Sequence, residues 1–278
     1  MKPTRTYAEW SKQAPLKARV REGLRDLYVT NLSLGKRIDR STDWIRFPFY
    51  HHVFEDEKTG FRDQLTYLKN YGEFVSLNDA LSLVTNTGPL NGRYFCLTFD
   101  DGLKSCHWGA TPILSDLNIP AAFYLVTSMI GRSFEPTDPI ARNTFSFKGR
   151  DTTLDFLSWE ECQEMVSAGM TIGSHTVNHA RLSVLTDEQC LAELTQSKTE
   201  IEQRLGLECD HFCAPYGNPD TDFKISHHGN LAQSIGYKTF VTGQRGPTRK
   251  GDSPLSIKRD HVMANWGIHQ LRYFLSID

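Results

Sequence analysis

The 278-residue sequence has no long hydrophobic run, and its net charge is close to zero. No stretch approaches the roughly 20 apolar residues that a membrane-spanning helix needs. The start of the chain contains charges but no apolar core of a secretory signal. With a formal charge of −2, the whole chain is not a polycation built for nucleic acid. These absences predict a cytoplasmic protein with no nucleic-acid partner.

The six cysteines form no CxxC pair and no paired zinc-ligand spacing. Scattered thiols are typical of a reducing compartment and do not indicate a disulfide framework. The sequence also contains no internal repeat and no low-complexity tract. Hydrophobic residues at 39% and charged residues at 23% are ordinary for a globular protein, which excludes a disordered or collagen-like chain.

The low net charge hides a division along the chain. Residues 1–46 have a net charge of +6, and the remainder has −8. Residues 14–34 place leucines at helical spacings between Lys and Arg, which predicts a basic amphipathic helix. This helix either packs its leucines on the main domain or touches an anionic membrane surface. The predicted division is a basic helical extension over residues 1–44 and one catalytic domain over residues 45–278.

Short apolar stretches alternate with helical patterns from residue 45 onwards. Strands are predicted at 45–53, 93–99, 121–127, 170–174, 209–213, 237–242 and 255–262. Helices are predicted at 60–71, 77–84, 108–117, 157–169, 186–206, 221–235 and 265–275. This alternation is typical of βα units with a parallel sheet, and about seven units suit a (β/α) barrel. The polar insertion at 131–156 is predicted to form a lid or a substrate-binding loop.

Titratable side chains follow two of the predicted strands. Asp100 and Asp101 follow one strand, and His175 and His179 follow another. In parallel α/β folds the carboxyl ends of the strands meet on one side, where sites form. One aspartate and two histidines make a complete set of protein ligands for a catalytic divalent metal. The other aspartate is then free to act as a base toward the water that the metal activates.

Each of these two motifs also has a simpler explanation. The aspartates could cap the following helix, and the histidines could be satisfied surface groups. For either motif alone, the simpler explanation would be preferred. The presence of both motifs, each at a strand end, favours a metal site.

The segments TFDDG (98–102), SHTVNH (174–179) and PYG (215–217) occur in this order. With them, the chain resembles the polysaccharide deacetylases, a carbohydrate esterase family that shares the NodB-homology domain, over roughly residues 45–265. The resemblance implies a distorted (β/α) barrel of about seven parallel strands. It also implies a metal-dependent hydrolase that removes N-acetyl groups from an N-acetylated sugar or glycan precursor.

The resemblance further implies roles for individual residues. Asp101, His175 and His179 are expected to bind a divalent metal, usually zinc, and Asp100 is expected to be the general base. The backbone N–H of Tyr216 is expected to hold the oxyanion together with the metal.

Histidines outside the two motifs are the candidates for the remaining roles. The resemblance implies a late histidine as the general acid that protonates the leaving amine. His261 is best placed for it, although it could equally be an exposed histidine at a strand end. His269 lies in the final predicted helix and is less suitable. His51, at the end of the first predicted strand, either lines the substrate cleft or hydrogen-bonds a loop carbonyl.

The sequence departs from the family's pattern in two places. Many members have an arginine just before the Pro-Tyr pair, where it contacts the base, but Phe212-Cys213-Ala214 stands here. The partner of the base must therefore come from elsewhere, and Arg259 is the candidate. The family's Asp-x-x-Asp-Trp motif is not recognisable.

Two other functions stay open. The same fold could hydrolyse a non-sugar C–N bond, as in a ureide or a cyclic imide, or it could be a degenerate module that only binds carbohydrate. For a cytoplasmic deacetylase, the expected substrate is a precursor in surface-glycan assembly. The basic helix at 14–34 would then contact the inner face of the membrane.

Overall fold

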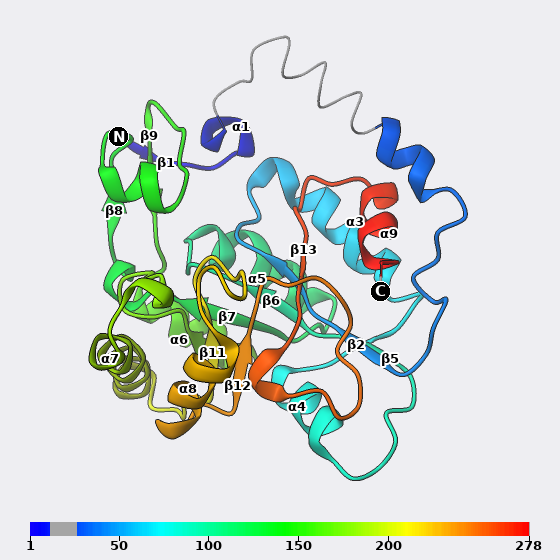
Figure 1. Ribbon diagram of the computed structural model, residues 1–278. Helices are drawn as coiled ribbons and strands as arrows, with labels where there is room; N and C mark the ends of the chain where they lie inside the picture. Colours follow the sequence, from blue (N-terminus) through cyan, green and yellow to red (C-terminus); the bar gives the residue numbers. More distant parts are fainter. Residues whose placement is uncertain (12–26, 278) are drawn as a thin grey trace.

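A curled sheet of seven parallel strands organises the computed structural model, which describes residues 1–11 and 27–277 (Figure 1). Every neighbouring pair of strands in this sheet is parallel. In spatial order the strands are β12 (Thr239–Val241), β11 (His211–Cys213), β10 (Thr171–Ser174), β7 (Ala121–Leu125), β6 (Leu97–Phe99), β3 (Pro48–Tyr50) and β13 (Asp260–His261). The predicted distorted (β/α) barrel of about seven parallel strands is confirmed.

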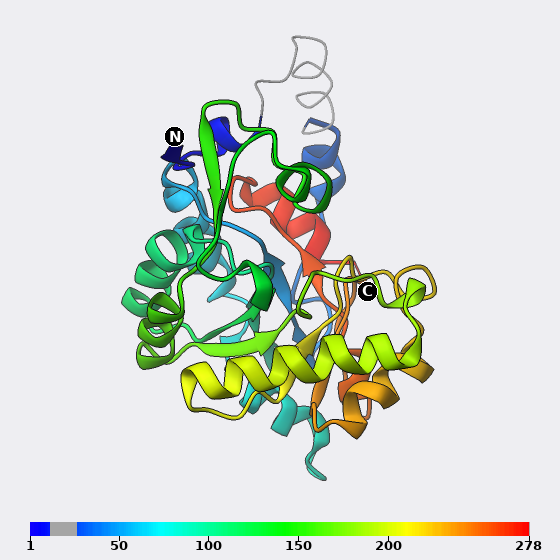
Figure 2. The ribbon, with the colours of Figure 1, turned by 90° about the vertical axis from the view of Figure 1, so that its left-hand side faces the viewer.

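Helices lie around the outside of this sheet (Figures 1 and 2). They are α3 (Lys58–Leu68), α4 (Leu77–Thr85), α5 (Thr111–Asp116), α6 (Trp159–Ser167), α7 (Asp187–Leu205), α8 (Asn230–Ser234) and α9 (Ile268–Leu275). For two of these helices, the structure confirms an end residue that the sequence predicted. Ser158 and Glu161 form a capping box at the start of α6, and Gly206 ends α7 in the left-handed conformation at φ 65°.

Two of the predicted strands are each divided by one residue. The 45–53 segment forms β2 (Trp44–Arg46) and β3, and the 93–99 segment forms β5 (Arg93–Phe95) and β6. In both cases the first half belongs to a separate small sheet with the order β2-β5-β4, where β4 is Glu73–Phe74. The chain therefore passes from the small sheet into the central one twice.

Two predicted elements near the C-terminus are too long. The helix expected at 221–235 is only a π-helical turn, Ile225–Gly229, followed by α8. Its first residues instead form a local turn, because the Asp222 carboxylate accepts hydrogen bonds from the backbone and side-chain N–H groups of Asn218 (2.9 and 2.7 Å). The strand expected at 255–262 is reduced to β13, because Pro254 starts a 3-10 turn instead.

The N-terminal residues pair with the 131–156 insertion. Strand β1 (Lys2–Pro3) lies parallel to β9 (Thr152–Asp155), which pairs antiparallel with β8 (Ser133–Phe134). The short helix α1 (Tyr7–Trp10) follows β1 and lies near this small sheet in Figure 1. Thus the beginning of the chain and the insertion form one small sheet, separate from the central one. The boundary at residue 44 stays a prediction.

The basic helix predicted at 14–34 falls largely on residues 12–26, which lie outside the described part of the chain. Residues 27–33 are helical, with Val29 and Ser33 buried and Leu27 and Tyr28 exposed. Among the described residues, no helix is both long and apolar enough to cross a membrane.

Aromatic rings pack beneath the carboxyl ends of the central strands. The rings of Phe99 and Phe123 stack at 4.6 Å, and Tyr50 stacks on Phe99 at 5.4 Å. Burial of each such side chain contributes roughly 1.5–3 kcal/mol. The Tyr50 hydroxyl also donates a hydrogen bond to Gln64 of α3 (2.9 Å). This packing holds the ends of β3, β6 and β7 in fixed positions.

Candidate active site

A cavity of about 410 Å³ lies at the carboxyl ends of the central strands. This volume is within the roughly 300–1,000 Å³ typical of ligand sites. All of the residues that the sequence singled out for the site line this cavity: His51, Asp100, Asp101, His175, His179, Tyr216 and His261. His269, the less suitable acid, is not among the lining residues.

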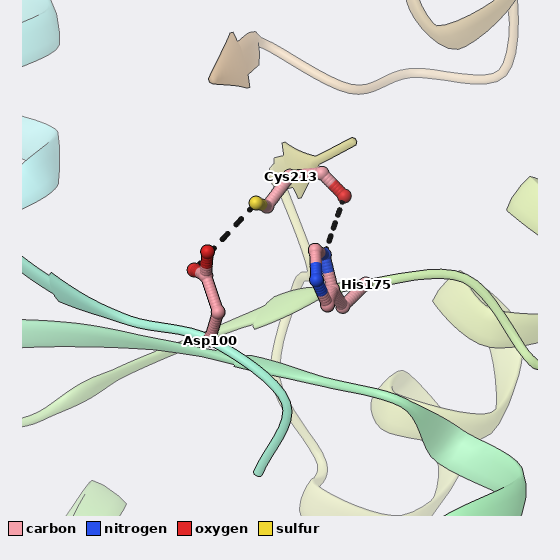
Figure 3. Close-up of side chains that lie close together, drawn as sticks. All are labelled: Asp100, His175 and Cys213. Carbon is pink, nitrogen blue, oxygen red and sulfur yellow. Dashed lines mark hydrogen bonds between the residues drawn. The ribbon is translucent and has the colours of Figure 1, made fainter. Parts of the chain in front are cut away.

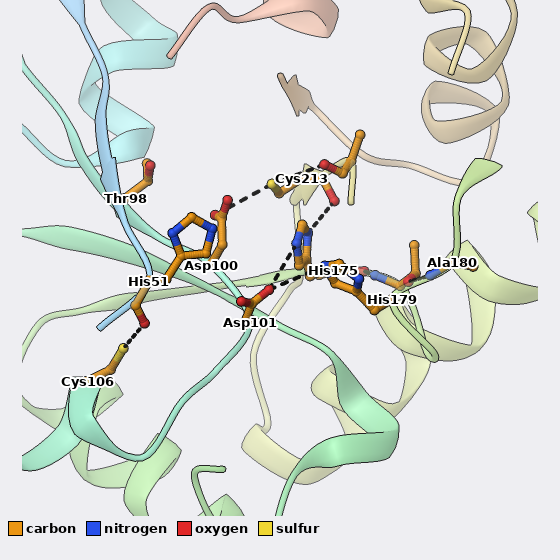
Figure 4. A network of polar contacts seen from close by, with 12 residues as sticks. His51, Thr98, Asp100, Asp101, Cys106, His175, His179, Ala180 and Cys213 are labelled. Atoms are coloured by element: carbon orange, nitrogen blue, oxygen red, sulfur yellow. Dashed lines mark hydrogen bonds and ion pairs between the residues drawn. The ribbon is translucent and has the colours of Figure 1, made fainter. Parts of the chain in front are cut away.

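Asp101, His175 and His179 come together at one wall of the cavity (Figure 4). Their ligand atoms all lie within 4.8 Å of one another. The Nε2 atoms of His175 and His179 face the same Asp101 oxygen at 3.6 and 3.4 Å. These distances are long for hydrogen bonds, so the three side chains converge without strong bonds among themselves.

The protonation state of His175 suits a metal ligand. Its Nδ1 lies 2.8 Å from the carbonyl oxygen of Cys213, which can only accept, so Nδ1 bears the proton and the Nε2 lone pair faces Asp101. Burial lowers the pKa of His175 to about 4, so the ring is neutral near neutral pH. One carboxylate and two imidazoles are a donor set that fits a divalent ion such as zinc.

The backbone around these ligands has an unusual conformation. Asp101, Thr176 and His179 have φ angles of 73°, 65° and 56°, in the left-handed region that few non-glycine residues adopt. Each costs of order 1 kcal/mol or more and persists only where the surroundings enforce it. One enforcing group is Glu193 of α7, whose carboxylate accepts hydrogen bonds from the backbone N–H groups of Val177 (2.9 Å) and Asn178 (3.0 Å).

Asp100 points to a different partner. Both of its carboxylate oxygens accept hydrogen bonds from Arg259, at 2.7 Å each. Burial alone would raise the pKa of Asp100, but the charge and hydrogen bonds of Arg259 outweigh it and hold the pKa well below its usual range. Arg259 is fixed in turn by Thr98 Oγ1 (3.1 Å) and the Thr242 carbonyl (2.8 Å). The predicted pairing of Arg259 with Asp100 is confirmed.

A second cluster of ligand types, Asp100, His175 and Cys213, lies beside the first (Figure 3). It is a poorer metal site. Arg259 already occupies both oxygens of Asp100, and burial raises the pKa of the Cys213 thiol well above its usual value. The neutral thiol donates weakly to Asp100 (3.6 Å). Since metals bind the thiolate, the donor set that includes Asp101 is the better one.

Tyr216 presents its backbone to the cavity from a strained turn. Its φ is 65°, and its N–H donates no hydrogen bond to another residue of the described ranges. The ring packs against His179 at 4.8 Å, with the Arg181 guanidinium 4.4 Å from its centroid. The turn requires glycine at the next position, because Gly217 has φ 82° and a Cβ there would lie 2.7 Å from the backbone nitrogen of Gly243.

The rings of His51 and His261 contact each other, and both contact Phe49. The centroids of the two histidine rings are 5.4 Å apart. Burial, followed by the charges of His51 and Arg245, lowers the pKa of His261 to about 3. Both histidine rings line the cavity, and Figure 4 shows the His51 ring beside Asp100.

Sequence reasoning missed several residues that line the cavity, and Trp10 and His52 are the two with polar rings. Trp10 comes from α1 and His52 follows His51 directly. Neither belongs to one of the recognised motifs. Trp10 is brought to the site by the pairing of β1 with the insertion and by hydrogen bonds between residues 5–7 and the turn at 55–56, and no local sequence signal predicts these contacts.

Comparisons with known proteins agree with this architecture. The family model for polysaccharide deacetylase matches residues 87–240, and the chain belongs to this family. Over 245 residues the chain is 21% identical to YxkH of Bacillus subtilis (strain 168), described as a candidate polysaccharide deacetylase, with 83% of this chain and 78% of that protein covered.

Solved structures share the fold. IcaB from Ammonifex degensii matches with a TM-score of 0.69 and 23% identity, covering 84% of this chain and 98% of that one. The Streptococcus pyogenes deacetylase PplD, in complex with acetate, matches with a TM-score of 0.64 and 22% identity, covering 84% and 99%.

Proposed function

We propose that this chain is a metal-dependent deacetylase that hydrolyses the N-acetyl group of an acetylated sugar or glycan precursor. The observation that supports it most is the division of labour between two adjacent carboxylates. Asp101 lies with His175 and His179, whereas Asp100 is held as an anion by Arg259. A ligand set next to a second carboxylate that is not one of the ligands is the arrangement that amide hydrolysis needs.

Asp101, His175 and His179 would hold the divalent ion, for which zinc is the first candidate. When bound, the ion would supply Lewis-acid chemistry that polarises the acetyl carbonyl and makes water more acidic. Asp100 would take a proton from the attacking water. Arg259 keeps this carboxylate ionised and aimed, at the cost of some basicity.

The remaining steps use other cavity residues. The free N–H of Tyr216 would donate a hydrogen bond to the oxygen that becomes negative when water adds to the acetyl carbon. The C–N bond then breaks, and the amine leaves with a proton. We assign that proton to His261. Because its imidazole is neutral at rest, it must first receive the proton that Asp100 removed from water. His51 is the second candidate, because its ring lines the same cavity and lies beside Asp100.

Acetate release tests the reaction. Purified protein would be offered N-acetylglucosamine, its oligomers, a ureide and a cyclic imide, before and after removal of metal with a chelator. We expect acetate from the sugars only, loss of activity on chelation and recovery with added zinc. Ring opening of the ureide or imide without acetate would favour a different C–N hydrolase. Saturable sugar binding with no acetate and no metal uptake would indicate a binding module.

A substrate with a good leaving group separates the two histidines. 4-Nitrophenyl acetate needs no proton on its leaving oxygen, so a variant lacking the general acid keeps this activity and loses amide hydrolysis. We expect this pattern for His261→Ala. The same pattern in His51→Ala, with amide hydrolysis intact in His261→Ala, would transfer the role to His51.

Location in the cytoplasm and membrane contact through residues 14–34 stay predictions. Flotation with anionic liposomes would compare the full chain with a variant whose Lys and Arg at 14–34 are changed to Gln. Equal binding of the two proteins would remove this segment from the proposal.

A further inference from the structure

We infer that Arg245 positions His261, the residue to which the proposed function assigns the general acid. The Arg245 guanidinium donates a hydrogen bond from Nη2 to the carbonyl oxygen of His261 (2.9 Å). Arg245 is not among the residues that line the cavity, so it would act through His261 and not on the substrate. This inference rests on the proposed function, and it extends the working parts of the site to the segment after β12.

The His261 carbonyl lies at an outer edge of the central sheet. Strand β13 is the last strand on its side and has only β3 as a neighbour. The N–H groups of Asp260 and Val262 both donate to carbonyls of the 47–49 segment (2.9 and 3.0 Å). Because alternate peptide groups of a strand point to opposite sides, the His261 carbonyl points away from that segment. A carbonyl in this place needs another partner, and Arg245 supplies it.

The Arg245 guanidinium is held on two further sides. Its central carbon lies 4.5 Å from the ring centroid of Phe274 in α9, a distance at which a cation is attracted to an aromatic face. Its Nη1 lies 3.8 Å from Oδ1 of the buried Asp260. The other oxygen of Asp260 accepts a hydrogen bond from Arg46 (3.0 Å). Arg245 is therefore fixed between the last strand and the last helix of the chain.

These contacts determine where the His261 ring points. Successive side chains of a strand leave it on opposite faces, so Arg259 and His261 share the face that lines the cavity. Asp260 points to the other face, where Arg46 holds it. With Asp260 bound on one face and the His261 carbonyl bound at the edge, the strand cannot rotate about its own axis. A misplacement of about 1 Å can cost roughly 100-fold in rate, so this restraint matters for proton transfer.

A simpler explanation is that Arg245 only packs α9 against the barrel. Loss of Arg245 would then lower stability without a selective effect on the step that needs a general acid. The two explanations therefore differ in one measurable ratio, the turnover of an amide relative to that of an activated ester.

This ratio tests the inference in the zinc-loaded protein. Arg245→Ala would be assayed for acetate release from N-acetylglucosamine and its oligomers, and for hydrolysis of 4-nitrophenyl acetate, whose leaving group needs no proton. We expect kcat for the amide to fall about 10- to 30-fold, with KM and ester turnover within about 2-fold of wild type. Intact ester turnover would show that the variant is folded.

Three further variants make the result specific. In the His261→Ala background, Arg245→Ala should lower amide turnover by less than about 2-fold more, because the two changes affect the same step. Arg245→Lys keeps a cationic donor and should recover amide turnover to within about 3-fold of wild type. Lys250→Ala removes an exposed cation of the same loop, outside the cavity, and should leave both activities unchanged.

Equal losses of amide and ester turnover in Arg245→Ala would overturn the positioning role. Unchanged amide turnover, or additive losses in the double variant, would overturn it as well.

A measurement without substrate separates this role from the proposed function. In nitrogen-15 NMR spectra of the histidine rings, Arg245→Ala should shift the signals of His261 and leave those of His227, an exposed histidine outside the cavity, in place. Unshifted His261 signals would overturn the positioning role. Shifted signals in a protein that releases no acetate from any sugar would leave the positioning of His261 standing and refute the deacetylase proposal.

Discussion

Asp100 and Asp101 are neighbours in the chain, yet their carboxylates face two different regions of the site. On the histidine side, Asp101 lies with His175 and His179. On the arginine side, Asp100 is bound by Arg259, with Cys213 next to it. The first region has the donor set that we propose for a divalent cation, and the second region contains a cationic side chain of its own. Burial raises the pKa of both carboxyl groups, but Arg259 holds the pKa of Asp100 below its usual range, and the neighbouring histidines hold the pKa of Asp101 below its usual value.

The comparison also shows what each side costs. The histidine side stores backbone strain, since Asp101 and His179 have positive φ angles. The arginine side instead buries a full ion pair, with Arg259 1% exposed and Asp100 3% exposed. A buried pair is costly to desolvate, and it is worth keeping where an anion of fixed direction is needed.

The largest expected effect is on the histidine side. His175→Ala removes a ligand, so we expect loss of bound divalent metal and a fall in deacetylation of more than about 100-fold. Metal analysis of the purified protein checks this. His227→Ala, which removes an exposed histidine outside the cavity, is the matched control and should retain metal. Full metal content in His175→Ala would contradict the assignment.

On the arginine side, Arg259→Ala leaves Asp100 buried without its partner. Breaking a buried pair in this way costs about 3–5 kcal/mol, so the free energy of unfolding should fall by that order. Urea denaturation measures it. Arg204→Ala, an exposed arginine on α7, is the control and should change stability by less than about 0.5 kcal/mol. A similarly small change in Arg259→Ala would show that Asp100 does not depend on the pair.

The two sides also differed in how well the sequence predicted them. The histidine side lies in two short motifs, where residue type and spacing define the ligands. The arginine side is assembled from β6, β11 and the segment before β13, which are far apart in the chain. Arg259 could be named only because the family's usual arginine is absent. Its bonds to Thr98 and Thr242 depend on strand order, which no local pattern contains.

The fold, like the site, could be predicted only in part from the sequence. Alternating apolar strands and well-capped helices such as α6 and α7 have strong local signals. No local signal predicts the breaks in the strands at Phe47 and Cys96, or the pairing of β1 with β9. These features arise from contacts between segments that are distant in the chain. For this reason the position of Trp10 in the cavity wall could not be predicted.

Acid should destabilise the fold through His211, whose buried ring contacts Thr239 and Asn78. Burial lowers the pKa of His211 to about 4, from about 6.5 when unfolded. Between these values the unfolded chain binds more protons, so stability falls as pH falls from about 6.5 to 4, by on the order of 3 kcal/mol. The free energy of unfolding should differ less between pH 7 and pH 4.5 in His211→Gln than in wild type. The same difference in both proteins would show that His211 does not contribute to the loss of stability in acid.

A smaller effect is expected for Glu193, which holds the loop between the two histidine ligands. Glu193→Ala frees the N–H groups of Val177 and Asn178, and metal affinity should fall roughly 10-fold. Glu193→Gln keeps one acceptor oxygen, so its metal affinity should lie between those of wild type and Glu193→Ala. Competition with a chromogenic chelator measures all three proteins. Equal affinities would mean that the loop keeps its shape without this contact.

The most direct test of the division between the two sides is Asp100→Asn, assayed for metal content and deacetylation in the same preparation. The Asp100 side chain is held by Arg259 and is not in the ligand set with Asp101. We therefore predict about one divalent ion per chain, as in wild type, together with a loss of more than about 100-fold in turnover. Loss of the metal along with activity, or full turnover in this variant, would contradict the account.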